Sequence, residues 1–358
     1  MKVFFYITSI ERGGGAERVI CNLANQFSLA GNDCTMITSH PEEVEYALES
    51  DIKRVNLALS RTSGFFRRNR ELYSGLRKLV LTEKPHVLIS FMAEPNFRAV
   101  PACFGTDTKT IISVRNDPDR EYPTFFHRIL AKSLFKRADY AVFQTTDAKN
   151  WFPTRLRKKS EVIFNPIDEK FLNEPLSERG KDIVATGRLE PQKNHRLLID
   201  AFTRIADRTE GKLVIYGEGS LRGELQSRID ENGMHDRILL PGRTTDVISS
   251  IRNASMYVLS SDFEGMPNAL MEAMALGLPC ISTDCPCGGP GELIENGKNG
   301  LLVKTGSVCD LSEAMLRILE NGSMASEMGK QAKKDCGKYT SSGIFKKWLS
   351  VVKKVAAE

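Results

Sequence analysis

The feature of this sequence that most constrains its fold is an alternation of short apolar runs with helical stretches, carried through in two series. In the first half, turn residues border each apolar run, and residues 16–30 carry apolar side chains at helical spacing until Gly31 ends the helix. Strands separated by helices pair in parallel as βαβ units. The runs that we interpret as strands are residues 3–10, 34–38, 87–91, 110–114 and 140–144.

The alternation restarts in the second half of the chain. Residues 161–164 lead into Asn165-Pro166, where we expect a break, and a polar stretch follows. Residues 195–207 have helical spacing. The apolar runs of this series are residues 183–185, 213–216, 238–240, 256–259 and 280–283. Two separate series predict two doubly wound, Rossmann-like α/β domains.

The last segment, residues 341–357, is amphipathic and basic, as the first half is. We therefore expect a C-terminal crossover helix that packs on the first domain. The expected domains are residues 1–165 with 340–358, and residues 166–339. Two facing domains of this type leave an interdomain cleft between the carboxyl ends of their sheets, where ligands bind.

Net charge separates the same two parts of the chain. Residues 1–165 with 340–358 carry a net charge of +10, and residues 166–339 carry −5. This asymmetry indicates that the two domains meet different partners. In the basic part, two aromatic and three cationic side chains stand together ahead of a helix and are predicted to meet an anionic membrane surface. They are Phe65, Phe66, Arg67, Arg68 and Arg70.

Composition excludes several classes of protein. Hydrophobic residues are 41% of 358, enough for ordinary cores, so the chain is neither disordered nor fibrous. No apolar run approaches the length of a membrane-spanning helix. The first run is interpreted as a strand rather than a signal peptide, because no small-residue cleavage site follows it. The eight cysteines lack C-x-x-C spacing, so reduced, mostly buried thiols and no metal site are expected.

The strongest chemical signal is the segment 264–272, EGMPNALME, which follows an apolar run. Pro267 suits a first helical turn, so Glu264 is expected in the loop at the end of a strand and Glu272 in the next helix. Carboxylates accept hydrogen bonds from sugar hydroxyls, and N–H groups at a helix start bind anions. On spacing alone, a turn carboxylate and a solvated helix carboxylate explain the two glutamates equally well.

Two further segments also follow predicted strands. In residues 187–194, GRLEPQKN, the cations Arg188 and Lys193 can both reach one diphosphate. In residues 13–18, GGGAER, glycines let the backbone approach a ligand, although the pattern is neither G-x-G-x-x-G nor a P-loop. Either segment alone is also typical of an ordinary surface loop.

In this order, the GGAER loop, the GR-x(4)-K loop and EGMPNALMEAMALGLP resemble the retaining, nucleotide-sugar-dependent glycosyltransferases of family 4, which have the GT-B fold. The resemblance covers nearly the whole chain. Within the family, the sequence is similar to bacterial enzymes that assemble capsule, lipopolysaccharide or lipid-linked oligosaccharides. The resemblance implies transfer of a hexose or N-acetylhexosamine from a UDP-linked donor to a glycan acceptor linked to lipid diphosphate. It also implies no metal or other cofactor, no nucleic acid partner, and a cytoplasmic location, peripheral on the inner face of the bacterial cytoplasmic membrane.

The resemblance further implies roles for the matching residues. The predicted catalytic residues are Arg188 and Lys193, which would stabilise the departing diphosphate, and Glu264, which would bind the donor sugar. Glu272 would accept from the ribose hydroxyls. The other implied donor contacts are Gly14, Gly15, Arg243, Gly265, Met266, Pro267, Asn268, Ala269 and Leu270. The implied mechanism is front-face attack, in which the leaving diphosphate takes the acceptor's proton.

One position departs from the family pattern. Many relatives have a histidine after the strand that corresponds to residues 110–114, where this chain has Arg115 and Asn116. Arg115 either replaces that histidine at the donor sugar or faces the acceptor. We expect His195, which opens a helix, to have a packing or capping role.

Several other interpretations stay open. Asp117-Pro118-Asp119 is a D-x-D, which we interpret as a turn rather than a metal site. Residues 217–223, GEGSLRG, hint at dinucleotide binding, but the third glycine is one position late. A UDP-sugar epimerase of the same fold and a non-enzymatic nucleotide-sugar- or glycan-binding protein are the main alternatives. Acceptor-dependent release of UDP would separate a transferase from both.

Overall fold

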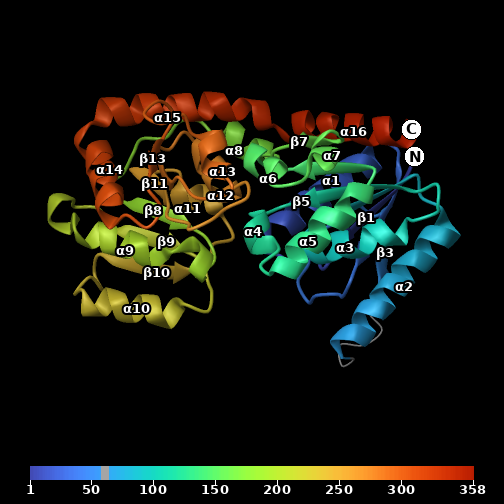
Figure 1. Ribbon diagram of the computed structural model, residues 1–358. Coiled ribbons are helices and arrows are strands. Elements are labelled where there is room, and N and C mark those ends of the chain that lie inside the picture. The colour runs from blue at the N-terminus through green and yellow to red at the C-terminus, as the bar shows by residue number, and fades with distance from the viewer. Residues whose placement is uncertain (58–63) are drawn as a thin grey trace. The chain divides into compact units, whose positions relative to one another are not determined.

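A computed structural model describes residues 1–57 and 64–358, although not the side chain of Phe65. The chain divides into two compact units (Figure 1). The first unit consists of Met1–Pro166 and Ser342–Glu358, and the second of Ile167–Ser341. The two breaks lie one and two residues from the domain limits expected from the sequence.

The first unit is built on a sheet of seven parallel strands in the order β3-β2-β1-β4-β5-β6-β7. From β1 the chain winds outward to β3, returns to β4 beside β1, and then winds the other way. The strands are β1 (Lys2–Ile7), β2 (Asp33–Thr38), β3 (Lys53–Asn56), β4 (Val87–Phe91), β5 (Lys109–Val114), β6 (Tyr140–Phe143) and β7 (Ser160–Val162). The helices are α1 (Gly15–Leu29), α2 (Phe65–Glu83), α3 (Ala93–Ala102), α4 (Pro118–Glu121), α5 (Phe125–Leu134), α6 (Thr146–Asn150), α7 (Thr154–Arg157) and α16 (Ser341–Ala357).

The side chains of β1 alternate between the two faces of this sheet. Phe4 and Tyr6 are buried in a cluster with Leu72 of α2. Phe5, between them, meets Phe27 of α1, with ring centroids 5.7 Å apart. The sheet is therefore covered on both faces, by α2 and α3 on one side and by α1 on the other, as a parallel sheet requires.

Helix α16 packs on the same face as α1. Trp348 is buried with its ring centroid 5.7 Å from that of Phe91 in β4. Phe345 lies edge-on to Phe27 at 5.2 Å. These contacts confirm the prediction that the C-terminal segment crosses back to the first unit. In Figure 1 the N and C termini of the chain lie close together.

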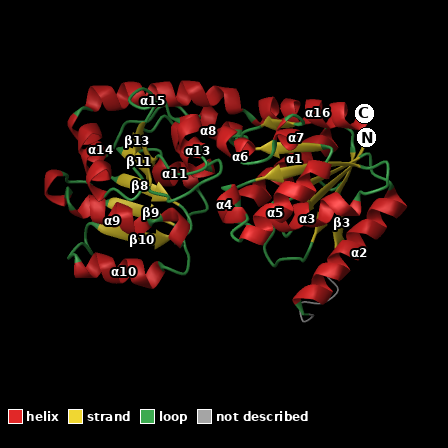
Figure 2. Cartoon of the chain, in the orientation of Figure 1, coloured by secondary structure: helices red, strands yellow, loops and turns green. Residues whose placement is uncertain are grey.

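The second unit has a sheet of six parallel strands in the order β10-β9-β8-β11-β12-β13. Figure 2 shows helices around the sheets of both units. The strands are β8 (Ile183–Thr186), β9 (Leu213–Tyr216), β10 (Ile238–Gly242), β11 (Met256–Leu259), β12 (Cys280–Thr283) and β13 (Leu301–Val303). The helices are α8 (Glu169–Asn173), α9 (His195–Thr203), α10 (Arg222–Glu231), α11 (Val247–Ile251), α12 (Asn268–Ala275), α13 (Gly289–Leu293), α14 (Val308–Glu320) and α15 (Gly322–Cys336). The prediction of two doubly wound α/β domains is confirmed.

The sequence analysis did not identify β3 and β7, the two edge strands of the first sheet, or β13, an edge strand of the second. Three of the four residues of β3 are exposed, so this strand has no continuous apolar run. β13 has only three residues. The first strand ends at Ile7 rather than at residue 10. Edge strands need less apolar surface than central ones, which explains why periodicity did not reveal them.

All eight cysteines are free, and seven of them are buried. The expectation of mostly buried thiols is therefore confirmed. Burial raises the pKa of several of these thiols, for example that of Cys285 to about 12, to which the negative charge of Glu264 contributes. A protonated, buried thiol is a poor nucleophile.

Candidate functional site

The strand order of the second unit reverses between β8 and β11, which are neighbours in the sheet. In doubly wound sheets, ligands bind outside the carboxyl ends of the strands at such a reversal, because the loops diverge there. The loop after β8 holds Arg188 and Lys193, and the loop after β11 holds Glu264. The reversal therefore brings the three predicted catalytic residues to one edge of one sheet.

Polar contacts hold these two loops together. The Nδ2 atom of Asn194 donates to the Oδ1 atom of Asp262 at 2.7 Å. The Oγ atom of Ser260 donates to the carbonyl oxygen of Lys193 at 2.9 Å, and Gln192 Nε2 donates to the carbonyl of Phe263 at 3.0 Å. These contacts fix the relative position of the loops before any ligand is present.

Lys193 and Glu264 form an ion pair at the centre of this arrangement. The Nζ–Oε1 distance is 2.5 Å, and the side chains are 15% and 7% exposed. Ser261 Oγ donates to the same carboxylate oxygen at 2.6 Å, and Gln192 Nε2 approaches the other at 3.4 Å. The sequence analysis predicted both charged residues but missed Ser261 and Gln192, although both lie in the same two motif loops.

Arg188 differs from Lys193 in its surroundings. Its side chain is exposed, and its Nη2 atom lies 3.5 Å from Gln192 Oε1. The next residue, Leu189, is completely buried and anchors the loop in the core. The loop thus presents one exposed and one largely buried cation, and the exposed guanidinium can reach a bound anion.

The structure places the two glutamates as predicted. Glu264 lies in the loop after β11, and Glu272 lies within α12; both are buried, at 5% and 7% exposure. Pro267 is the N-cap of α12 rather than part of its first turn. The helix begins with Asn268, Ala269 and Leu270, the residues predicted to offer backbone amides.

Glycine at position 289 lets the loop after β11 pack closely against the start of α13. A Cβ atom there would lie 1.6 Å from the carbonyl oxygen of Gly265. Met266, next in the loop, is 5% exposed. Hence this part of the loop packs directly against the first turn of α13, a contact that the sequence analysis did not identify.

The GEGSLRG segment packs against the loop after β8, which carries Arg188 and Lys193. A Cβ atom on Gly217 would lie 1.8 Å from the carbonyl oxygen of Gly187, and one on Gly219 would lie 2.4 Å from that of Leu189. Ser220 donates to the Glu190 carboxylate from its backbone nitrogen at 3.0 Å and from Oγ at 2.9 Å. Close packing of two loops therefore accounts for these glycines, and no dinucleotide site is needed to explain them.

His195 begins α9 and is 4% exposed. Asn194 is the N-cap, since its Oδ1 atom accepts from Leu197 N at 3.1 Å. Burial, together with the positive charge of Lys193, lowers the pKa of His195 to about 4. Of the two predicted roles, packing is confirmed, because His195 is buried. The capping role belongs to the preceding residue, Asn194.

Three other residues predicted to contact the donor lie outside the two loops that follow β8 and β11. Arg243 follows β10 and is exposed; β9 separates β10 from β8 in the sheet. Gly14 and Gly15 belong to the first unit, where Gly15 begins α1 at the reversal between β1 and β4. Each unit thus has predicted site residues at its own reversal of strand order.

Arg115 is buried in the first unit at 7% exposure. Its guanidinium donates to Asn165 Oδ1, and its Cζ atom lies 4.5 Å from the centroid of the Phe91 ring. Burial lowers the pKa of Arg115 to about 9, although the negative charges of Glu121 and Glu17 oppose this. Asn116 Oδ1 accepts from Asp117 N at 2.9 Å. Their predicted sugar or acceptor contacts stay predictions.

The D-x-D is a helix start rather than the turn predicted from the sequence. Asp117 is the N-cap of α4, and its Oδ1 atom accepts from Asp119 N at 3.0 Å. Asp119 accepts from Trp151 Nε1 at 3.0 Å and pairs with Arg128 at 3.3 Å. Both carboxylates therefore have structural partners. Among residues 1–57 and 64–358, no group of three or more His, Cys, Asp or Glu side chains could hold a metal ion.

The predicted membrane residues lie in the first turns of α2, not ahead of a helix as the sequence analysis expected. The helix starts at Phe65, whose side chain lies outside the described residues. Phe66 is 87% exposed. Arg67 pairs with Glu71 at 2.9 Å, Arg68 is half-buried, and Arg70 is exposed. None of the helices in the part of the chain that the structure describes is long and apolar enough to span a bilayer.

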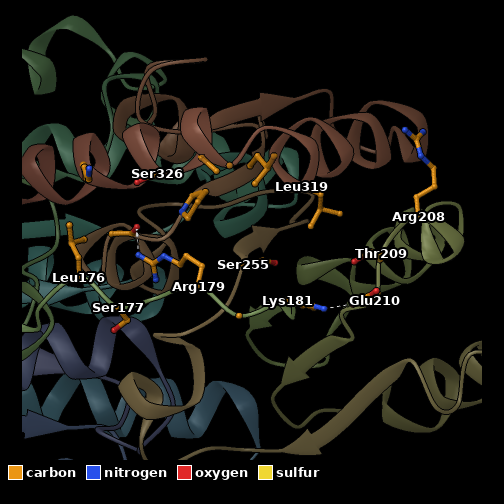
Figure 3. Close-up of a pocket in the computed structure, with 17 residues that line it drawn as sticks. Leu176, Ser177, Arg179, Lys181, Arg208, Thr209, Glu210, Ser255, Leu319 and Ser326 are labelled. Atoms are coloured by element: carbon orange, nitrogen blue, oxygen red, sulfur yellow. Dashed lines mark hydrogen bonds and ion pairs between the residues drawn. The ribbon is translucent and has the colours of Figure 1, made fainter.

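A cavity of about 500 Å³ lies in the second unit, at the other edge of the sheet (Figure 3). It is lined by residues just before β8, β9, β11 and β12, and by the junction of α14 with α15. Arg179 donates to the carbonyls of Arg252 and Gly277, each at 2.6 Å, and Lys181 pairs with Glu210. Internal partners thus satisfy these cations, and no predicted site residue lines this cavity.

Comparisons with known proteins agree with this architecture. The family description Glycosyltransferase Family 4 matches residues 13–171, and Glycosyl transferases group 1 matches residues 166–335. The two matches meet beside the break between the units.

Individual relatives are similar over part or all of the chain. An uncharacterized glycosyltransferase of Methanocaldococcus jannaschii is 30% identical over 243 residues, which are 61% of this chain and 60% of that protein. The GalNAc-alpha-(1->4)-GalNAc-alpha-(1->3)-diNAcBac-PP-undecaprenol alpha-1,4-N-acetyl-D-galactosaminyltransferase of Campylobacter jejuni is 26% identical over 362 residues, 99% of each protein. Among solved structures, the apo form of the lipopolysaccharide outer core galactosyltransferase WaaB matches with a TM-score of 0.79 at 22% identity, over 99% of each chain. With a family match in each unit and a relative aligned along the whole chain, the protein belongs to the family 4 glycosyltransferases of the GT-B fold.

Proposed function

We propose that this protein is a retaining glycosyltransferase of cell-surface polysaccharide or oligosaccharide assembly. The donor is a UDP-linked hexose or N-acetylhexosamine, and the acceptor is a glycan linked to lipid diphosphate. The observation that carries the proposal is the Lys193–Glu264 ion pair beside Arg188 at the reversal of strand order. Two cations suit a diphosphate, and a carboxylate suits sugar hydroxyls.

In the proposed reaction, the bond between the anomeric carbon and the donor diphosphate breaks. The acceptor hydroxyl bonds to that carbon on the same face, and its proton passes to the departing diphosphate oxygen. Arg188 and Lys193 stabilise the negative charge that develops there. Because Lys193 is already oriented by Glu264 and by the loop contacts, little reorganisation is needed when the donor binds.

The remaining donor contacts are proposed by resemblance. Glu272 of α12 would accept from the ribose hydroxyls, and Glu264 would hold the sugar. Gly14, Gly15 and Arg243, with residues 265–270, would complete the donor site. UDP is proposed as the nucleotide by resemblance to the family, and no metal or other cofactor is proposed.

The acceptor proposal is supported by the name of the Campylobacter jejuni relative, which includes an undecaprenol-linked substrate. A lipid-linked acceptor lies at a membrane surface. The first unit, with its excess of cations, would bind an anionic leaflet electrostatically. We therefore propose a peripheral location on the inner face of the bacterial cytoplasmic membrane, with Phe66 and Arg70 of α2 among the contacts.

The test is acceptor-dependent release of UDP. The protein is incubated with a panel of UDP-sugars, with and without an undecaprenyl-diphosphate-linked glycan in detergent. We expect release only with both substrates, and NMR of the product should show the anomeric configuration of the donor. Arg188→Ala should lower kcat by about 10²–10³, the effect of losing one charge-stabilising contact.

The matched control is Arg196→Ala on α9, an arginine whose side chain is 59% exposed. It should leave kcat unchanged. Epimerised donor without UDP release would favour the epimerase, and donor binding without turnover would favour a binding protein. An inverted product would contradict the retaining mechanism, and an unchanged kcat in Arg188→Ala would contradict the diphosphate role.

A further inference from the structure

Helix α5 exposes most of its apolar side chains instead of burying them. The exposed fractions are 79% for Phe125, 69% for Phe126, 48% for Ile129 and 37% for Leu130. Positions i, i+1, i+4 and i+5 share one side of a helix. Helices of a globular domain ordinarily turn such a stripe toward the core. We call these four side chains the α5 face.

The inward side of α5 is held by polar and cationic groups. Arg128 Nε donates to the carbonyl of Tyr122 at 3.1 Å, and its Nη2 atom lies 3.3 Å from Asp119 Oδ1. Lys132 Nζ lies 4.0 Å from the centroid of the Trp151 ring. Rotating the helix to bury the α5 face would break these contacts. Its outward orientation is therefore fixed by the fold.

The segment that carries the α5 face has cations but no carboxylate of its own. Residues 125–137 contain four cations and no carboxylate, and Lys136 and Arg137 directly follow the helix. The α2 helix carries the exposed Phe66 and further arginines, and α3 lies between α2 and α5 on the same side of the sheet (Figure 1). Exposed aromatic and aliphatic groups beside several cations are typical of helices that lie in a membrane interface.

We propose that the α5 face inserts into the interfacial region of an anionic phospholipid bilayer, with Lys136 and Arg137 against the headgroups. This inference deepens the proposed function, on which it rests for its biological purpose, and it moves the main membrane contact from α2 to α5. A second copy of the chain fits the face less well, because a symmetric contact would bring the same cations together.

The test is sedimentation with vesicles of phosphatidylglycerol and phosphatidylcholine, compared with vesicles of phosphatidylcholine alone. Wild type should bind the anionic vesicles at low salt and release at high salt, because salt screens exposed charges. Phe125→Ser/Phe126→Ser should weaken binding at least about tenfold, since the inserted apolar surface is lost. Leu29→Ser, which removes a 73% exposed side chain from α1 on the other face of the sheet, should bind like wild type.

A second variant, Ile129→Ser/Leu130→Ser, covers the case in which the first does not fold, as judged by circular dichroism. The inference is wrong if wild type does not bind anionic vesicles, or if a folded α5 variant binds as wild type does. It is also wrong if wild type forms dimers that the variants do not form. UDP release with the detergent-solubilised acceptor is measured in parallel. If UDP is not released although the α5 variants bind vesicles more weakly than wild type, the proposed reaction is wrong and the proposed membrane contact of α5 is supported.

Discussion

At the scale of single residues, Lys193 and Glu264 depend on each other, because either charge would be costly without its partner. Both side chains are largely buried, at 15% and 7% exposure. Lys193→Met would leave the Glu264 carboxylate without its counter-charge, which costs about 3 kcal/mol for a buried pair. We expect that loss in the free energy of unfolding measured with urea, and Lys193→Met/Glu264→Gln should recover most of it.

The exposed pair Lys181–Glu210 provides the comparison for this prediction. Its side chains are 71% and 79% exposed, so Lys181→Met should change the unfolding free energy little. Equal losses in the two lysine variants would contradict the assignment of a buried pair. A double variant no more stable than Lys193→Met would also contradict it.

A second prediction at the residue scale concerns His195 and pH. Burial holds the folded-state pKa near 4, below the usual value near 6.5. Between pH 4 and pH 6.5, the unfolded chain therefore binds a proton at His195 more readily than the folded protein does. The free energy of unfolding is consequently highest above pH 6.5 and decreases as the pH falls. From pH 7.5 to pH 5, this linkage should lower the unfolding free energy by about 2 kcal/mol.

Urea unfolding of His195→Gln at both pH values checks this, since the variant should lose less stability on acidification than wild type. His235→Gln is the control, because the His235 side chain is 67% exposed. If wild type and His195→Gln lost the same stability between the two pH values, neutral burial of His195 would not be the cause.

At the scale of the elements, loops that follow neighbouring strands set the shape of the proposed donor site. The loop after β9 packs on the loop after β8 through Gly217, where a Cβ atom would lie 1.8 Å from Gly187 O. Gly217→Ala should therefore cost about 1–3 kcal/mol of stability, as overpacking does. It should also weaken UDP binding in calorimetry, because the loop that carries Arg188 is displaced.

Gly223 of the same segment is the matched control. It lies in α10 with nothing within 4 Å of an added Cβ atom. Gly223→Ala should stabilise the protein by about 0.5 kcal/mol through helix propensity. If Gly217→Ala were as harmless as Gly223→Ala, the packing explanation of the GEGSLRG segment would fail.

At the scale of the whole molecule, the D-x-D lies in one unit, and the two cations that we propose bind the diphosphate lie in the other. The carboxylates of Asp117 and Asp119 cap α4 and bind Trp151 and Arg128. We therefore predict that UDP release persists in EDTA, with Arg188 and Lys193 supplying the positive charge. Asp117→Ala should cost about 1 kcal/mol by loss of the cap and leave this metal independence unchanged.

Complete loss of UDP release in EDTA, with recovery on adding Mn²⁺, would contradict this prediction. In that case, recovery of UDP release by Mn²⁺ is also measured in Asp117→Asn/Asp119→Asn. If this variant did not recover, the D-x-D would hold the metal.

The sequence by itself determined the two α/β series, the C-terminal crossover helix and the loops that carry Arg188, Lys193 and Glu264. These features depend on apolar periodicity and on residues such as Gly31 and Pro267, which act within a few positions along the chain. The edge strands β3, β7 and β13 were missed because they lack a sufficient apolar run.

Only the tertiary structure decided which of these residues meet. Lys193 and Glu264 are 71 positions apart, and they pair because β8 and β11 are neighbours in the sheet. Gly217 looked like part of a ligand motif until its packing on Gly187 was known. The apolar stripe of α5 would be assigned to the core from its sequence, yet it faces outward. Strand order and helix orientation result from contacts summed over the whole domain, and local periodicity does not encode them.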